Sequence, residues 1–111
     1  MARQHPAEVV GSFLMESVFN CISSLNKTIT DILEKFDIVL IPMVNPDGVI
    51  HGNSRCNLAG LDLNRQWSDG GMKKLIPECQ GLRKFIWGKL SEGSVEMIID
   101  LHGHSKKYHF I

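Results

Sequence analysis

The chain has 111 residues, 43% of them hydrophobic and 22% charged, and its 12 basic and 12 acidic side chains give a formal net charge of zero. These values are typical of one soluble globular domain and give no indication of a nucleic-acid or membrane partner, so we expect neither. Three cysteines without CxxC spacing indicate neither a disulfide framework nor a thiolate zinc site, and with no signal peptide or membrane span they predict a cytoplasmic protein.

The first predicted element is a helix that begins near "RQHPAE", residues 3–8. Pro at the first helical position and an acid two residues later are ordinary helix-start signals. Apolar residues then recur at helical spacing between Ala7 and Leu25, and we expect this stripe to face a core. Residues three apart at a helix start share one face, so His5 and Glu8 could instead hold one zinc ion. These six residues alone favour the helix start and leave the metal interpretation open.

A second, shorter helix is predicted where Ile29, Ile32, Leu33 and Phe36 recur at helical spacing. The next segment, "FDIVLIPMV" at residues 36–44, is almost continuously apolar, as in a strand buried on both faces of a parallel sheet. "NPDG" ends that strand with residues typical of a turn.

The second half of the chain predicts a long loop, a helix and another buried strand. The loop runs from His51 to Gly71, and the helix runs from about Pro77 to Leu90 with Gly93 as its stop. "SVEMIIDL", residues 94–101, is the strand, and "KYHFI", residues 107–111, reads as the start of a third. Helices alternating with apolar strands predict an α/β fold with a mostly parallel central sheet flanked by helices. A strand this apolar needs a neighbouring strand on each side and helices on both faces, and two full strands cannot supply that. We therefore expect this sheet to be incomplete at both ends.

Two polar motifs follow the carboxyl ends of the predicted strands, where open α/β sheets form their sites. One is "NPDG" and the other is "HGHS", which begins with His102. Together with His5 and Glu8, His102 would complete a set of two imidazoles and one carboxylate, a known catalytic zinc set with an open fourth position. The alternative for His102 alone is a histidine at a strand end without a metal.

A third motif, "GLDLNRQW" at residues 60–67, places Asp62, Asn64 and Arg65 in the long loop. The planar guanidinium of Arg binds carboxylates through two parallel hydrogen bonds, so the C-terminus of a peptide is a natural ligand. The alternative is a surface salt bridge with an Asn that caps the loop.

Together, "ARQHPAE", "IPMVNPDGVIHGNSRCNLAGLDLNRQW" and "IIDLHGHSKK" resemble the zinc metallocarboxypeptidases, and specifically the cytosolic carboxypeptidase branch. One visible departure is Ala7, where the branch usually has Gly. The resemblance implies that one Zn²⁺ is bound by His5, Glu8 and His102, and that the terminal carboxylate of the substrate is held by Asn64 and Arg65. It also implies that Arg55 polarises the scissile carbonyl, as the catalytic residue of this chain, and that Asp62 orients His5.

The resemblance further implies a zinc-dependent carboxypeptidase that removes C-terminal residues, glutamates in particular, from protein tails such as those of tubulin. We interpret residues 1–111 as a partial catalytic domain that lacks the strand preceding "ARQHP" and the C-terminal part with the catalytic Glu, so we expect the chain alone to be inactive. The alternatives are a zinc amidohydrolase acting on N-acyl amino acids and a non-catalytic module that binds zinc or peptide C-termini.

Two other polar residues, on either side of His102, carry weaker expectations. His104 is expected beside the site or at the surface rather than as a ligand, because the zinc set is already complete. Asp100 is expected to hydrogen-bond the adjacent backbone.

Overall fold

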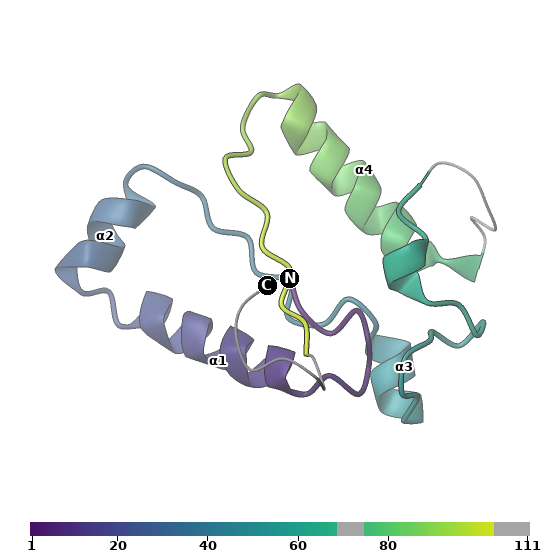
Figure 1. The fold of residues 1–111 in the computed structure, drawn as a ribbon. Coiled ribbons are helices and arrows are strands. Elements are labelled where there is room, and N and C mark those ends of the chain that lie inside the picture. The colour runs from purple at the N-terminus through teal and green to yellow at the C-terminus, as the bar shows by residue number, and fades with distance from the viewer. Residues whose placement is uncertain (69–74, 104–111) are drawn as a thin grey trace.

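A computed structural model describes residues 1–68 and 75–103 of the chain, and these residues are mostly helical (Figure 1). The helical elements are α1 (Val10–Ser23), α2 (Lys27–Leu33), α3 (Pro46–His51), a short 3-10 helix η1 (Leu63–Arg65) and α4 (Pro77–Ser91). Within the described ranges no segment forms a β-strand. The predicted α/β fold with a mostly parallel central sheet is therefore wrong for the described part of the chain.

The two segments predicted as strands, residues 36–44 and 94–101, run on either side of the first residues of the chain. Ala2 donates its N–H to the Ile41 carbonyl at 3.0 Å and accepts from the Val44 N–H at 2.9 Å, while the Leu101 N–H donates to Met1 at 2.8 Å. Only one isolated parallel bridge, between Ala2 and Leu101, is formed in the described residues. These few hydrogen bonds do not extend into a ladder, so the described residues contain no sheet.

The absence of a sheet in the described residues leaves apolar side chains in solvent. Val39 is 56% exposed and Ile98 is 51% exposed, so the prediction that both segments are buried on both faces is also wrong. The predicted third strand, residues 107–111, lies outside the described residues.

The predicted helix start at Pro6 is wrong, because α1 begins at Val10 and residues 5–8 form a turn. The apolar stripe of α1 does not face a core either: Phe13 is 65% exposed and Val18 is 40% exposed. Instead, α1 is buried at Gly11 and Met15. A Cβ added at Gly11 would lie 3.0 Å from the Leu101 carbonyl oxygen, so this glycine allows α1 to approach residues 99–103 closely.

The remaining helices follow local signals in the sequence. Asn26 caps α2 by accepting from the Ile29 N–H at 3.1 Å, and Asn45 caps α3 by accepting from the Gly48 N–H at 3.0 Å. "NPDG" therefore ends the extended segment as predicted, but it begins a short helix rather than a turn. The predicted helix from Pro77 is confirmed by α4, and Gly93 follows α4 with a φ of 66°, as its predicted stop requires.

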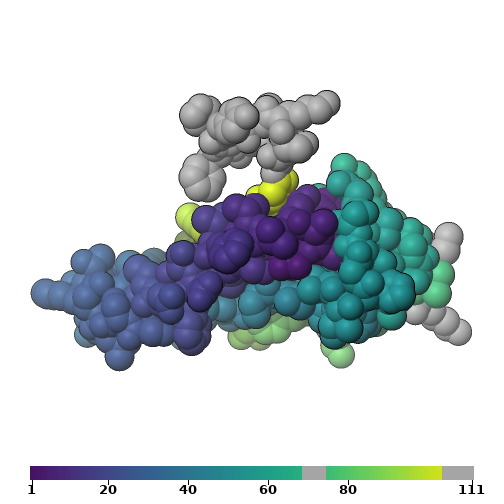
Figure 2. Space-filling model, turned by 90° about the horizontal axis from the view of Figure 1, so that it is seen from below, coloured from purple at the N-terminus to yellow at the C-terminus, as the bar shows by residue number. Residues whose placement is uncertain are grey.

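The hydrophobic core is small and lies where η1, α4 and the segment before α3 meet. It consists of Val44, Leu63, Ile76 and Cys79, with Met1, Ile41, Leu61, Trp67 and Leu82 packed against it. Helices α1 and α2 extend away from this core to one side, which gives the molecule an elongated outline (Figures 1 and 2). No helix of the described residues has the length and apolar character needed to cross a membrane.

Candidate metal centre

The turn at residues 5–8 is held in place by hydrogen bonds on both of its sides. Arg3, with a positive φ of 57°, donates from its guanidinium to the Pro6 carbonyl at 2.5 Å and to the Ser12 hydroxyl at 2.7 Å. On the other side, the Ala7 N–H donates to the Ser54 carbonyl at 3.1 Å. These contacts fix His5, which is 4% exposed, and the partly buried Glu8 in one orientation.

Three residues from the two ends of the described chain meet at this turn. His5 Nδ1 lies 2.7 Å from Glu8 Oε1, and His102 Nδ1 lies 3.0 Å from Glu8 Oε2. One ligand atom from each of the three residues lies within 4.8 Å of the other two. The Gly103 N–H also donates to Glu8 Oε2 at 2.8 Å. The structure thus brings together the three residues that the sequence analysis assigned to zinc.

Each histidine has a second carboxylate at its other ring nitrogen. His5 Nε2 lies 3.0 Å from Asp62 Oδ1, and His102 Nε2 lies 2.7 Å from Asp100 Oδ2. Because a carboxylate only accepts hydrogen bonds, Nε2 of each ring donates to the carboxylate behind it. A ring that keeps its one proton on Nε2 has its lone pair on Nδ1, the nitrogen beside Glu8 that a metal ion would take.

This arrangement fits a divalent cation. Without a cation, each Nδ1 can bond Glu8 only as a donor, which requires a second proton on each imidazole. With a cation beside Glu8, each neutral ring would give its Nδ1 lone pair to the ion instead. Two neutral imidazoles and a carboxylate are ligands that zinc takes in catalytic sites, and a carboxylate behind a ligating imidazole is the usual way of orienting it.

The electrostatics of the two inner carboxylates favour their charged forms. Burial raises the pKa of Glu8, but hydrogen bonds from the Gly103 N–H and the two histidines outweigh it, so the pKa lies below the ordinary value. Burial likewise raises the pKa of Asp62, and its contacts with His5 and Arg55 lower it further than burial raises it. Both carboxylates are therefore negative at neutral pH and attract a cation.

The other predicted site residues lie between residues 55 and 65 and differ in their contacts with the cluster. Arg55 donates from Nε to Asp62 Oδ2 at 2.7 Å, and its side chain is 48% exposed. Asn64 donates only its backbone N–H to Asp62, at 2.9 Å. The exposed Arg65 donates to the Asn64 carbonyl at 3.3 Å. Among the described contacts, neither the Asn64 nor the Arg65 side chain reaches a histidine.

Two residues beside the cluster were missed or misjudged from the sequence. Asp100 was expected to bond the adjacent backbone, which is wrong: its Oδ2 contacts His102 and accepts from the Gln4 side chain. The spacing offered a signal, because residues two apart on an extended segment point to the same side. Gln4 offered none. His104 lies outside the described residues.

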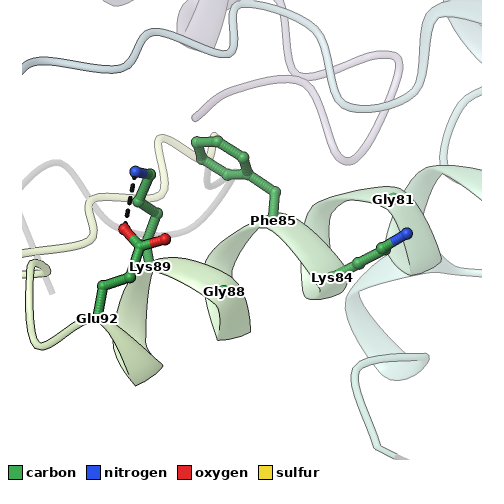
Figure 3. Close-up of a pocket in the computed structure, with 6 residues that line it drawn as sticks. All are labelled: Gly81, Lys84, Phe85, Gly88, Lys89 and Glu92. Carbon is green, nitrogen blue, oxygen red and sulfur yellow. Dashed lines mark hydrogen bonds and ion pairs between the residues drawn. The ribbon is translucent and has the colours of Figure 1, made fainter.

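A hollow of the described surface lies elsewhere, along one face of α4 (Figure 3). It has a volume of about 350 Å³ and is lined by Gly81, Lys84, Phe85, Gly88, Lys89 and Glu92. An ion pair of 3.0 Å joins Lys89 to Glu92 at one end. None of the predicted site residues lines it, so the candidate site remains the cluster at the turn.

Comparisons with known proteins agree on one family. A model described as zinc carboxypeptidase matches residues 1–110. Cytosolic carboxypeptidase 2 of Homo sapiens is 41% identical over 106 aligned positions, which cover 96% of this chain and 12% of the relative. Cytosolic carboxypeptidase 1 of Homo sapiens is 37% identical over 112 positions, which cover 96% of this chain and 9% of the relative.

Among solved structures, a metallo-carboxypeptidase from Burkholderia cenocepacia matches with a TM-score of 0.81 and 29% sequence identity. The match covers 93% of this chain and 27% of that chain. This chain therefore spans only 9% and 12% of the two human relatives and about a quarter of the solved bacterial one.

Proposed function

Because this chain belongs to the zinc carboxypeptidase family, we propose that it acts in zinc-dependent hydrolysis of the C-terminal peptide bond of protein tails. The observation that supports this most strongly is the convergence of His5, Glu8 and His102 at one point, each histidine backed by a carboxylate. The matched relatives are named carboxypeptidases, which favours this function over an amidohydrolase acting on N-acyl amino acids.

In this proposal, His5, Glu8 and His102 hold one Zn²⁺ and Asp62 keeps the His5 ring oriented. When bound, the ion would act as a Lewis acid that polarises the scissile carbonyl and lowers the pKa of a bound water. The chain's own contribution is to fix the ligands before the ion arrives. The Arg3 contacts hold the turn that carries His5, and the Gly103 N–H holds the Glu8 carboxylate.

The arginines of the loop supply the positive charges that a peptide C-terminus needs. Arg65 is exposed and uses one described hydrogen bond, to the neutral carbonyl of Asn64, so its guanidinium is free to take a carboxylate in two parallel bonds. Arg55 uses Nε to bind Asp62, which leaves its terminal nitrogens to polarise the scissile carbonyl beside the cluster. Asn64 would add a side-chain amide to the carboxylate site.

The same relatives support a substrate and a cellular compartment for this activity. Relatives named cytosolic carboxypeptidases support a cytoplasmic enzyme, and the resemblance to that branch implies removal of C-terminal glutamates, with tubulin tails as the expected partner. Peptides that differ only in the last residue, Glu against Leu, test this part. Equal binding of the two would contradict the preference for glutamate.

A binding experiment tests the role of the substrate carboxylate. Calorimetry compares one Glu-ended peptide with the same peptide amidated at its C-terminus, in the zinc-loaded chain. We expect the free carboxylate to bind more tightly and Arg65→Ala to remove about 10- to 100-fold of that affinity, the loss typical of a charged hydrogen bond. Lys35→Ala removes an exposed cation beyond α2 and serves as the control.

Equal affinity for the two peptides, or an Arg65→Ala variant that still distinguishes them, would contradict this role. Mass spectrometry of the same mixtures detects cleavage. Cleavage of the free-carboxylate peptide would contradict the non-catalytic module.

A further inference from the structure

A line of hydrogen bonds runs from a tryptophan in the long loop to the third residue of the metal cluster. The Trp67 indole N–H donates to Gln4 Oε1 at 2.8 Å. Gln4 donates from Nε2 to Asp100 Oδ2, and the same oxygen lies 2.7 Å from His102 Nε2. The line connects the loop after η1, the turn that carries His5 and the segment that ends at His102.

The directions of the bonds in this line follow from its two end groups, the indole N–H that only donates and the carboxylate that only accepts. An indole N–H can only donate, so the oxygen of the Gln4 amide must face Trp67 and its NH₂ must face Asp100. The Asp100 carboxylate can only accept, so His102 must present a protonated Nε2 to it. A ring with one proton, held on Nε2 by Asp100, has its lone pair on Nδ1, the atom that faces Glu8. Glu8 also only accepts, so without Asp100 that proton would move to Nδ1.

The middle of the line is held in place by burial of Gln4. Gln4 is 1% exposed, and the neighbouring Asn45 side chain donates to the backbone carbonyl of Gln4 at 3.3 Å. The other oxygen of Asp100, Oδ1, is buried without a hydrogen-bond partner in the described structure. A carboxylate oxygen that is buried without a partner costs free energy, so stability alone does not account for the placement of Asp100.

We propose that Asp100, oriented by Gln4 and Trp67, is a positioning residue that holds the His102 ring with its Nδ1 lone pair directed at the metal position. The proposal rests on the zinc function proposed above. It assigns to Asp100 the task at His102 that Asp62 performs at His5, and it makes the Trp67 indole one of the two groups that set the direction of the line.

The first test reads the histidine ring itself, in metal-free chain. Nitrogen-15 NMR, at a pH where the imidazoles are neutral, reports which ring nitrogen is protonated. We expect His102 to carry its proton mainly on Nε2 in the wild type and mainly on Nδ1 in Asp100→Ala, where Glu8 is the remaining carboxylate beside the ring. Trp67→Phe removes only the indole N–H from the line, and we expect a smaller shift in the same direction.

The second test measures zinc affinity by competition with a chelator. We expect Asp100→Ala to raise the dissociation constant about 10- to 100-fold, the usual effect of losing a carboxylate behind a ligating histidine. Asp31→Ala removes the same side chain from an exposed position on α2 and should change the constant less than about twofold. Asp100→Asn keeps the shape of the side chain and decides the question if Asp100→Ala does not fold.

An unchanged tautomer and an unchanged zinc affinity in the folded Asp100 variants would overturn the inference. A wild type that binds no zinc would overturn the proposed function instead. The tautomer of metal-free His102 would still decide the role of Asp100 in that case.

Discussion

Glu8 connects the two histidines of the candidate site, because its two carboxylate oxygens each face a different histidine. His5, Glu8 and His102 could be named from the sequence because their motifs resemble those of a known family. Gln4 could not, since a glutamine in a buried turn follows no periodic pattern and its partner lies 96 positions away. Asp100 was named, but its role depends on a contact with Gln4 that no local rule predicts.

The three cysteines differ enough in environment to give a residue-scale prediction. Burial raises the pKa of the fully buried Cys79 thiol to about 11, whereas Cys21 is exposed on α1. The thiolate is the reactive form, so at pH 8 only about a thousandth of Cys79 would react even if it were reached. We expect iodoacetamide to label Cys21 rapidly and Cys79 only after urea unfolding, as read by peptide mass spectrometry.

A single-cysteine variant that keeps Cys79 provides the control for that experiment. Rapid labelling of Cys79 in folded protein would contradict its position in the core beside Leu63.

At the scale of elements, the helices with local end signals were predictable and the segments that need distant partners were not. Asn26 before α2, Pro77 at the start of α4 and Gly93 after it act through adjacent backbone groups. Pro6 is also a residue typical of a helix start, but the turn around it is held by tertiary contacts such as that of Ala7 with Ser54. The prediction of the two apolar strands was wrong because strand formation depends on paired neighbours, and the apolar pattern of a segment does not show whether such neighbours are present.

One substitution at two glycines tests the packing of the helices. A Cβ at Gly48 in α3 would lie 2.6 Å from Asn45 Oδ1 and 2.7 Å from Pro6 Cγ, whereas a Cβ at Gly88 in α4 would meet nothing within 4 Å. We expect Gly48→Ala to lower the free energy of unfolding by about 1 to 3 kcal/mol through overpacking. Gly88→Ala should raise it by about 0.5 to 1 kcal/mol, since Ala favours the helix.

Urea unfolding followed by circular dichroism measures both changes. Effects of equal sign and size in the two variants would contradict the close approach of α3 to the turn at Pro6.

At the scale of the whole molecule, the candidate site joins regions far apart in sequence around a small core. Glu8 and His102 are 94 positions apart, and the described core contains only Val44, Leu63, Ile76 and Cys79. Large apolar side chains such as Val39 and Ile98 remain exposed. A molecule with so small a core depends strongly on any ligand that binds only its folded form.

Zinc should therefore stabilise the chain measurably. A free ion concentration of 100 times the dissociation constant adds about 2.7 kcal/mol to the free energy of unfolding, because the unfolded chain does not bring His5 and His102 together. We expect zinc, but not magnesium, to raise the melting temperature in differential scanning fluorimetry. His102→Ala should abolish this rise, and a rise of equal size in that variant would place the zinc elsewhere.

The most direct test of the account is the zinc content of the purified chain, measured by inductively coupled plasma mass spectrometry. Wild type, His5→Ala and His102→Ala are compared, with Cys21→Ala as a control at an exposed residue outside the site and circular dichroism to verify folding. We predict about one zinc per chain in the wild type and in Cys21→Ala, and almost none in the two histidine variants. A folded wild type without zinc, or zinc retained in both histidine variants, would contradict the metal centre.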